Sequence, residues 1–189
     1  MTPLVPAFEI GACNGWLFMM VFPLQWLAVL VIPGHIIERT GHPNDLIQSR
    51  RGKIMSRLAE IFWVFATLYS IFLPLRIGTP WSYGGLMMFV CGLMMLILAT
   101  LSVARTKADE PFVGGMYRLS RHPMYLSMIF IYASVCIAAV SWLFLVVTII
   151  TFFLQRFLAI QEERYCLEHF GHAYRQYMSR PPRWLGIPK

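Results

Sequence analysis

The stretch that decides the fold is residues 123–155, which read PMYLSMIFIYASVCIAAVSWLFLVVTIITFFLQ and form a run of 33 residues without a charge. A single helix of that length would measure roughly 50 Å, because each residue adds about 1.5 Å. The hydrocarbon core of a bilayer is only about 30 Å thick. We therefore predict a helical hairpin that turns near residues 139–141. Its first helix should begin near Arg121, and its second should continue to about Tyr165.

The composition of the whole chain points to the same environment. Of the 189 residues, 58% are hydrophobic and 13% are charged, whereas an ordinary soluble domain has about 25% charged residues. The mean hydropathy is +0.60. These values exclude a soluble domain and a disordered chain, and four widely separated cysteines exclude a disulfide scaffold. The class that remains is a small integral membrane protein.

Three further apolar stretches are long enough to cross a membrane, which takes about 20 residues. They are residues 12–33, 58–77 and 81–103. The third contains Gly84, Gly85 and Gly92, which suit close packing against another helix.

The expected architecture is all-α, with five transmembrane helices in one membrane domain that covers residues 1–189. Residues 1–103 supply three spans, and residues 104–189 supply the hairpin and a tail. Within the tail, apolar residues recur at helical spacing over residues 164–177, which predicts an amphipathic helix at the cytoplasmic surface, with Gly171 breaking or bending it.

Basic residues distinguish the two sides of this predicted domain. Fourteen of the 16 Lys and Arg residues fall in the segments 34–57, 104–122 and 164–189. Because cytoplasmic loops carry an excess of Lys and Arg, we expect these segments in the cytoplasm, with the N-terminus outside and the C-terminus inside. The same rule explains the net charge of +7 without a nucleic-acid partner.

Polar residues at membrane depth are costly and are therefore functional candidates. With a turn centred near residue 140, the facing pairs at the cytoplasmic mouth of the hairpin should be His122 with Leu158, Tyr125 with Gln155, and Arg118 with Glu162. A purely structural alternative is that the charged residues form interfacial salt bridges and the tyrosines are ordinary interface aromatics. Pattern alone does not decide between the two.

A metal site has less support. Cys166, His169 and His172 recur at three-residue intervals, a spacing that a metal site can use. Gly171 intervenes and a fourth ligand is not evident, so we predict no metal. Motifs of soluble nucleotide-binding folds, such as a P-loop, do not occur.

Four short motifs follow one another along the second half of the chain. They are Gly115-x-Tyr117, Arg121-His122-Pro123-x-Tyr125, Glu162-Glu163 and Phe170-Gly171-x-x-Tyr174-x-x-Tyr177. This ordered set resembles the isoprenylcysteine carboxyl methyltransferases and related membrane methyltransferases, including the phospholipid N-methyltransferases. The resemblance covers about residues 115–183, just over a third of the chain.

The resemblance implies an enzyme that transfers a methyl group from S-adenosylmethionine to a lipophilic or small membrane-permeant acceptor at the cytoplasmic membrane face. Carried over residue by residue, the cofactor site would consist of Tyr117, His122, Pro123, Met124, Tyr125 and Glu162. Aromatic faces favour a sulfonium cation, and a carboxylate can accept hydrogen bonds from the donor. We expect the tail to fold back over this site. No catalytic residue is assigned.

One position departs from the family pattern. The carboxyl methyltransferases usually carry an arginine, associated with the acceptor, four residues before the first glutamate of the pair, where this chain has Leu158. Burying a carboxylate without a cation is costly, so we expect a neutral acceptor rather than a prenylcysteine carboxylate. Arg156 and Arg180 are the substrate-side candidates to replace the missing arginine.

Two other functions stay open at this point. A sterol-reductase-like, NADPH-dependent membrane oxidoreductase would share the Arg-His-Pro helix start, and Arg175, Arg180 and Arg183 could bind the 2′-phosphate. A non-catalytic membrane scaffold could use the same fold. The Glu162–Glu163 pair favours the methyl donor.

Overall fold

The computed structural model describes residues 9–25, 49–106 and 111–186. Within these ranges every regular element is a helix, as predicted. The elements in chain order are α1 (Trp16–Met19), α5 (Arg50–Ser70), α6 (Pro80–Ala104), the 3-10 helix η1 (Gly115–Arg118), α7 (Pro123–Ala139) and α8 (Trp142–Met178). The predicted first span lies only partly within the described residues, where an apolar helix covers Trp16–Gln25.

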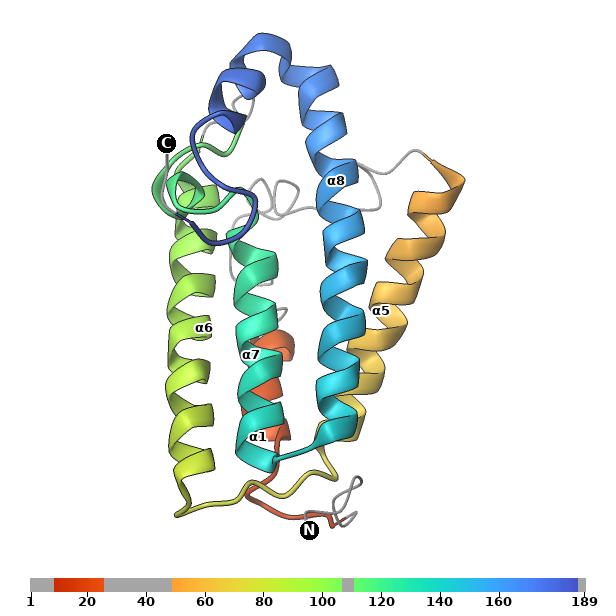
Figure 1. The fold of residues 1–189 in the computed structure, drawn as a ribbon, viewed down its shortest axis with the longest axis vertical. Helices are drawn as coiled ribbons and strands as arrows, with labels where there is room; N and C mark the ends of the chain where they lie inside the picture. The colour runs from red at the N-terminus through yellow and green to blue at the C-terminus, as the bar shows by residue number, and fades with distance from the viewer. Residues whose placement is uncertain (1–8, 26–48, 107–110, 187–189) are drawn as a thin grey trace.

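The long helices run roughly along the longest axis of the molecule (Figure 1). α7 lies between α6 and α8, α5 packs against α8, and α1 contacts both α7 and α5. Apolar side chains from α1, α5, α7 and α8 meet in one buried core that includes Met19, Tyr69, Ile131, Val135 and Phe144. The core therefore fixes the two arms of the hairpin relative to the N-terminal helices.

The predicted hairpin is confirmed. α7 ends at Ala139, Val140 adopts the left-handed conformation with φ 52° and ψ 48°, and α8 begins at Trp142. The Ser141 hydroxyl accepts a hydrogen bond from the Phe144 N–H, which caps the first turn of α8. The second arm is longer than predicted, because it stays helical beyond Tyr165 as far as the bend at Gly171, after which a second helical segment leads to Met178.

The predicted bend at Gly171 is also confirmed. This residue has φ 53° and ψ −119°, outside the helical region and in a conformation that glycine tolerates. The end of α8 consequently turns back toward the start of α7 and the end of α6 (Figure 1). The bend brings the tail over the mouth of the hairpin.

The predicted third span corresponds to α6, which packs along α7. A Cβ at Gly85 would lie 2.6 Å from the Ala138 Cβ and 2.7 Å from the Ser134 carbonyl oxygen, and one at Gly92 would lie 2.9 Å from the Phe130 Cβ. These two glycines therefore allow the backbones to approach closely. Gly84 is different, because its nearest contact would be at an ordinary 3.7 Å.

The predicted bounds of the second span were wrong. The helix is α5, which begins at Arg50 rather than residue 58 and ends at Ser70 rather than residue 77. The Ser49 side chain caps its start by accepting from the Gly52 N–H. Beyond the helix, the chain extends toward Pro74 and pairs with the N-terminal segment, where the Gly15 N–H donates to the Leu73 carbonyl. Neither the serine cap nor this backbone pairing contributes to hydropathy, so a prediction from hydropathy alone misses both.

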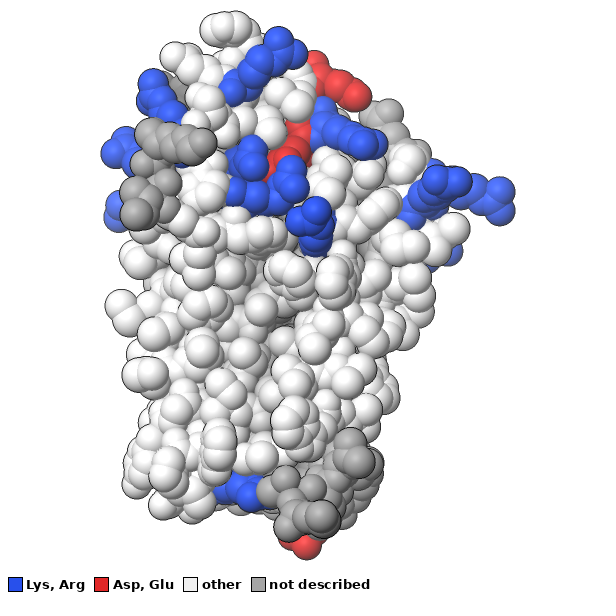
Figure 2. All heavy atoms as spheres, viewed as in Figure 1, with Lys and Arg blue, Asp and Glu red and all other residues white. Residues whose placement is uncertain are grey.

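Two of the described helices, α6 and α8, are long and apolar enough to cross a membrane. The helix Trp16–Gln25 and α7 are apolar but shorter. Figure 2 shows an uncharged band across the middle of the face in view, with Lys and Arg gathered mostly at the end where α8 bends. Helix α6 presents exposed apolar side chains along its length, among them Met87, Val90, Met94 and Leu98. This arrangement is expected of a protein surrounded by lipid.

Candidate active site at the mouth of the hairpin

The first turn of α7 positions the aromatic and histidine side chains of the site. His122 is the N-cap residue and Pro123 occupies the first helical position, where a missing N–H costs nothing. The Ser120 hydroxyl accepts from the His122 N–H at 3.2 Å. This local structure aims the buried His122 ring, 6% exposed, toward α8.

Glu163 is the centre of a buried ion-pair network. Arg183 donates to both of its oxygens, from Nε to Oε1 at 3.0 Å and from Nη2 to Oε2 at 2.6 Å. Arg121 Nε lies 3.3 Å from Oε1, and His122 Nε2 lies 3.2 Å from the same atom. A carboxylate that is only 4% exposed is thus fully paired, as a buried charge requires.

Glu162 has a different environment. It accepts a hydrogen bond from the Tyr125 hydroxyl, and its Oε2 lies 3.5 Å from His122 Nδ1. No arginine pairs with it in the part of the chain that the structure describes. Its side chain is 20% exposed, so one side of this carboxylate remains open to a ligand.

The charge state of the site follows from these contacts. Burial opposes a charge on His122, but the hydrogen bonds and negative charges of Glu162 and Glu163 outweigh it and raise the pKa of His122 above its ordinary value of 6.5. Burial and the charge of Glu162 raise the pKa of Tyr117 well above its ordinary value, so this phenol stays protonated. The His122 ring lies between the two glutamates, with Nδ1 facing Glu162 and Nε2 facing Glu163.

The predicted facing pairs were wrong by about one to two helical turns. His122 meets Glu162 and Glu163 rather than Leu158, and Tyr125 meets Glu162 rather than Gln155. Side chains of a helix tilt toward its N-terminus. In an antiparallel pair, those of α7 and α8 therefore tilt in opposite directions, and each α7 residue meets a later position of α8.

The remaining predicted site residues lie around this cluster. Tyr117, in η1, accepts a hydrogen bond at its carbonyl from the Tyr177 hydroxyl at 2.7 Å. Met124 packs against the hydrophobic core. Arg118 does not meet Glu162 and instead lines a surface cavity together with Arg180. Arg156 is exposed, whereas Leu158 is buried.

The chain after α8 closes one side of the mouth. The Arg121 N–H donates to the Pro182 carbonyl at 3.0 Å, and the Ser120 hydroxyl donates to the Arg183 carbonyl at 3.2 Å. Trp184 follows, with its ring 6.0 Å from the His122 ring and 5.4 Å from the Phe152 ring. Its Nε1 is buried without a hydrogen-bond partner among the described residues.

Sequence reasoning missed the roles of Glu163, Arg183 and Trp184. From the sequence, Arg183 is a candidate only for binding a nucleotide phosphate. The available signal was Pro181-Pro182, since two consecutive prolines cannot continue a helix and redirect the chain. The residues immediately after such a break were therefore candidates for contact with the site.

The predicted absence of a metal site stands as a prediction. The described residues contain no group of three or more His, Cys, Asp or Glu side chains arranged to hold a metal ion. The His169 ring stacks on Tyr165, with ring centroids 5.6 Å apart.

In the described residues, apolar helices combine with a polar cluster at one end of a helical hairpin, and these are features of a membrane-embedded enzyme. Residues 81–173, which are 93 of the 189 residues, match the model of the phospholipid methyltransferase family. The matched segment begins in α6 and continues to just beyond the bend in α8, and it includes the whole Tyr117–Glu163 cluster. No curated protein and no solved structure matches the chain.

The match to this family, whose members are membrane-bound methyltransferases, identifies the chain as a membrane methyltransferase. The family resemblance predicted from the sequence motifs is thereby confirmed. Methyltransferases of this family generally use S-adenosylmethionine.

Proposed function

We propose that this enzyme transfers a methyl group from S-adenosylmethionine to a lipophilic acceptor at the cytoplasmic membrane face. It does so from a single membrane domain with five spans, an outside N-terminus and a cytoplasmic C-terminus. Two observations support the orientation: the one-sided distribution of basic residues in the sequence and their concentration at the end where α8 bends (Figure 2).

The observation that carries the proposal is the contrast between Glu162 and Glu163. Glu163 is occupied by Arg121, His122 and Arg183. Glu162 is partly exposed and has a tyrosine and a histidine, but no arginine, beside it. A partly exposed carboxylate without an arginine partner, next to aromatic rings, suits a ligand that carries a positive charge.

S-adenosylmethionine fits this donor set, because it carries a sulfonium and an ammonium group. When bound, it supplies an electrophilic methyl group, which leaves with the C–S electron pair remaining on sulfur while the acceptor's lone pair forms the new bond. Glu162 would bind the positively charged part of the donor, and Tyr125 would orient that carboxylate. Tyr117, Pro123 and Met124 would border the donor.

His122 contributes by position. As an imidazolium it would hold both glutamates of α8 at a fixed distance from the start of α7. The exposed side of the Glu162 carboxylate would then keep a constant orientation toward the donor. The Arg183–Glu163 pair and the Trp184 ring would close the site against water. Such exclusion strengthens every polar contact inside the site.

A neutral acceptor agrees with the position of Leu158. This side chain is only 4% exposed and places no cation in the interior. Arg156 lies two residues before Leu158 on α8 and is exposed. It therefore does not replace the missing arginine in this arrangement. Arg180 remains the substrate-side candidate.

The two other functions are less well supported. Arg183, one of the three arginines that could bind the 2′-phosphate of NADPH, is already paired with Glu163. A scaffold without activity would have no use for a partly buried, incompletely paired carboxylate at membrane depth, which is costly to maintain.

Binding calorimetry in detergent tests the proposal with S-adenosylhomocysteine and NADPH in parallel. Wild-type protein should bind the homocysteine compound and not NADPH. Glu162→Gln should weaken that binding by about 1.5–3 kcal/mol, the usual value of a hydrogen bond to a charged group. Glu168→Gln, an exposed glutamate on the same helix, serves as the control. Equal affinity in wild type and Glu162→Gln would contradict this role of Glu162.

A further inference from the structure

Gln155, on α8, carries a buried amide oxygen that has no hydrogen-bond partner among the described residues. The side chain is only 3% exposed. Its Nε2 donates to the sulfur of Met128 on α7, so the amide lies between the two arms of the hairpin. Leaving a buried acceptor unpaired is costly, and polar groups at membrane depth are candidates for function.

The oxygen of Gln155 differs in kind from the other buried side-chain atoms without a hydrogen-bond partner. Within the described residues these are Arg121 Nε, Tyr132 Oη, Thr151 Oγ1 and Trp184 Nε1. Each of them carries a hydrogen to donate, and a backbone carbonyl oxygen has a second lone pair that can accept it. Gln155 Oε1 can only accept, whereas the N–H groups in the middle of a helix are already used. This oxygen therefore needs a donor from outside the helix.

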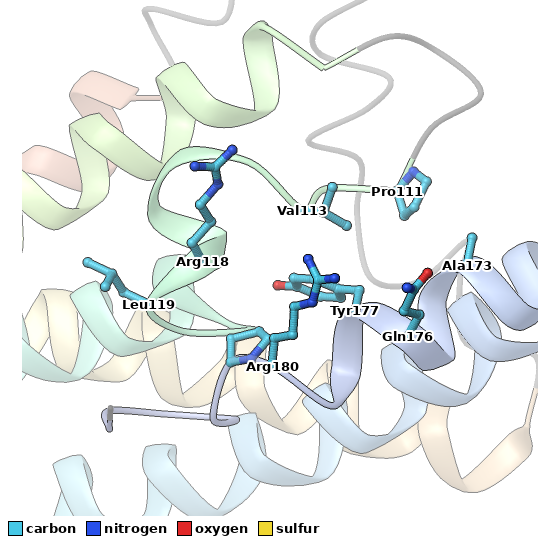
Figure 3. A pocket seen from close by; sticks show the side chains of 9 residues that line it. Pro111, Val113, Arg118, Leu119, Ala173, Gln176, Tyr177 and Arg180 are labelled. Atoms are coloured by element: carbon cyan, nitrogen blue, oxygen red, sulfur yellow. The ribbon is translucent and has the colours of Figure 1, made fainter. Parts of the chain in front are cut away.

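The surface cavity between η1 and the bent end of α8 makes no comparable demand (Figure 3). Arg118 and Arg180, which line it, are both exposed. Water solvates exposed guanidinium groups, so their charge does not require a ligand. The buried amide of Gln155 is the stronger indication of a binding contact.

The position of Gln155 relative to the proposed donor site suits contact with the acceptor. Gln155 lies two turns before Glu162 on α8, a distance of roughly 10 Å along the helix axis. Its neighbour Met128 follows Tyr125 by one turn on α7, and the Tyr125 hydroxyl donates to Glu162. The amide is therefore on the membrane side of the contact between Tyr125 and Glu162, at a distance that the amino-acid arm of the donor can span. With its ammonium group at Glu162, the donor can direct its methyl group toward Gln155.

Apolar side chains lie near the amide. Met128 is half-buried, and its unbranched chain has three rotatable bonds, so it can move away from Gln155 without a change in the backbone. Phe152, one turn earlier on α8, packs against the Trp184 ring, with ring centroids 5.4 Å apart. These side chains suit the apolar body of a lipophilic acceptor, and the amide supplies a polar contact among them.

We infer that Gln155 is a specificity-determining residue, whose Oε1 accepts a hydrogen bond from a neutral O–H or N–H group of the methyl acceptor. Such a bond uses the hydrogen of that group and leaves a lone pair free to face the methyl group. A carboxylate has no hydrogen to donate and would be repelled by the oxygen of Gln155. The inference rests on the proposed function for the identity of the ligand as the methyl acceptor, whereas the hydrogen bond itself needs no methyl donor.

The experiment measures binding to the full chain in detergent, without any methyl donor, by equilibrium dialysis of radiolabelled probes with uptake by protein-free micelles subtracted. The probes form two pairs: decylphenol with decylanisole, and decylaniline with N,N-dimethyl-decylaniline. Within each pair, methylation removes the O–H or N–H hydrogens and keeps the apolar body. The protein should bind at least one unmethylated probe about tenfold more tightly than its methylated partner, the factor that corresponds to about 1.4 kcal/mol. The pair that shows the preference distinguishes a hydroxyl from an amine.

Gln155→Leu should abolish this preference, because leucine cannot accept a hydrogen bond. The variant should remain as stable as wild type in thermal unfolding, since the change removes a buried oxygen without a partner. Two matched controls should keep the preference. Thr151→Val removes another buried, unpartnered oxygen one turn away on the same helix, and Gln176→Leu changes an exposed glutamine of α8.

Three results would overturn the inference: no preference in either pair, a preference that persists in Gln155→Leu, or a large loss of stability in that variant, which would show that the fold itself uses the amide. The affinity for S-adenosylhomocysteine should be the same in Gln155→Leu as in wild type, and a fall would assign Gln155 to the donor instead. A preference that depends on Gln155, together with unchanged S-adenosylhomocysteine affinity in Glu162→Gln, would support this contact and contradict the proposed function. Weakened S-adenosylhomocysteine binding in Glu162→Gln without any preference among the probes would support the proposed function and contradict this contact.

Discussion

The two faces of α7 are held to their neighbours in opposite ways. Toward α6, the contact is a tight apolar seam in which Gly85 and Gly92 allow backbone to approach backbone. Toward α8, the mouth of the hairpin is tied by charges, with Glu163 joining His122 and Arg121 to Arg183 in the tail. In lipid there is no hydrophobic driving force between helices, so close packing and polar contacts share the work.

This difference separates a permanent contact from one that can open. The contact between α6 and α7 at Gly85 and Gly92 depends on close packing and not on charge. The mouth depends on ion pairs to a tail that follows a bend at Gly171. A change in the conformation of the tail can therefore alter the site, whereas the packing of α6 against α7 keeps these two helices in fixed relative positions.

The largest effect is expected from Glu163→Gln. This change leaves two arginines and an imidazolium without their shared carboxylate, and removing one partner of a buried ion pair typically costs about 3–5 kcal/mol. We expect the thermal unfolding midpoint in detergent to fall and protease sensitivity to rise in residues 172–186. Glu168→Gln is the exposed control. A variant as stable as wild type would show that the ion pairs of Glu163 contribute little to the stability of the protein.

A smaller loss is expected from Gly85→Ala on the seam. The added Cβ would meet the Ser134 carbonyl at 2.7 Å, and overpacking of this kind costs about 1–3 kcal/mol. Gly84→Ala, one residue away, would place its Cβ 3.7 Å from Ile137 and should be tolerated. Thermal unfolding of both variants measures the difference; similar midpoints would mean that the seam is looser than described.

The mouth, unlike the seam, should respond to pH. Because the pKa of His122 is raised above its ordinary value of 6.5, its stabilising contribution is fully present below that value. It is lost as the pH rises through the raised pKa. The difference in unfolding midpoint between wild type and His122→Gln should therefore shrink from about pH 6 to about pH 9. A difference independent of pH would indicate that His122 acts only as a neutral ring.

The smallest effect on stability is expected from Trp184→Phe. This change keeps an aromatic ring against Phe152 and removes an N–H that has no partner within the described residues. Losing an unpaired buried donor is nearly neutral, so the shift should stay within about 1 kcal/mol. Trp184→Ala should cost more because the ring contact is lost as well. Equal losses in the two variants would point to an unrecognised partner for the indole.

Part of the fold was predictable because it depends on local sequence. The length of the uncharged run in residues 123–155 required a hairpin, and the turn at Val140 lies where length placed it. The ends of α5 were not predictable in this way. They depend on a serine cap and on pairing between Leu73 and Gly15, and neither contributes to hydropathy.

The site shows the same division. The motifs identified His122, Tyr125 and Glu162. Hairpin geometry placed them at the same end of the helix pair, with an error of about one to two turns in the facing positions, in the direction that side-chain tilt explains. The tie between Glu163 and Arg183 involves residues 20 positions apart on either side of a bend and two prolines. Only the path of the folded tail reveals it.

The most direct test of the central claim is methyl transfer itself, measured with purified protein, radiolabelled S-adenosylmethionine and a membrane lipid extract. The account predicts label in the lipid fraction that is stable to base, with a rate that falls at least about tenfold in Glu162→Gln, the loss of about 1.4 kcal/mol or more. A farnesylcysteine analogue should accept no label. Transfer that is unaffected by Glu162→Gln, or base-labile methyl ester on the farnesylcysteine analogue, would contradict the account.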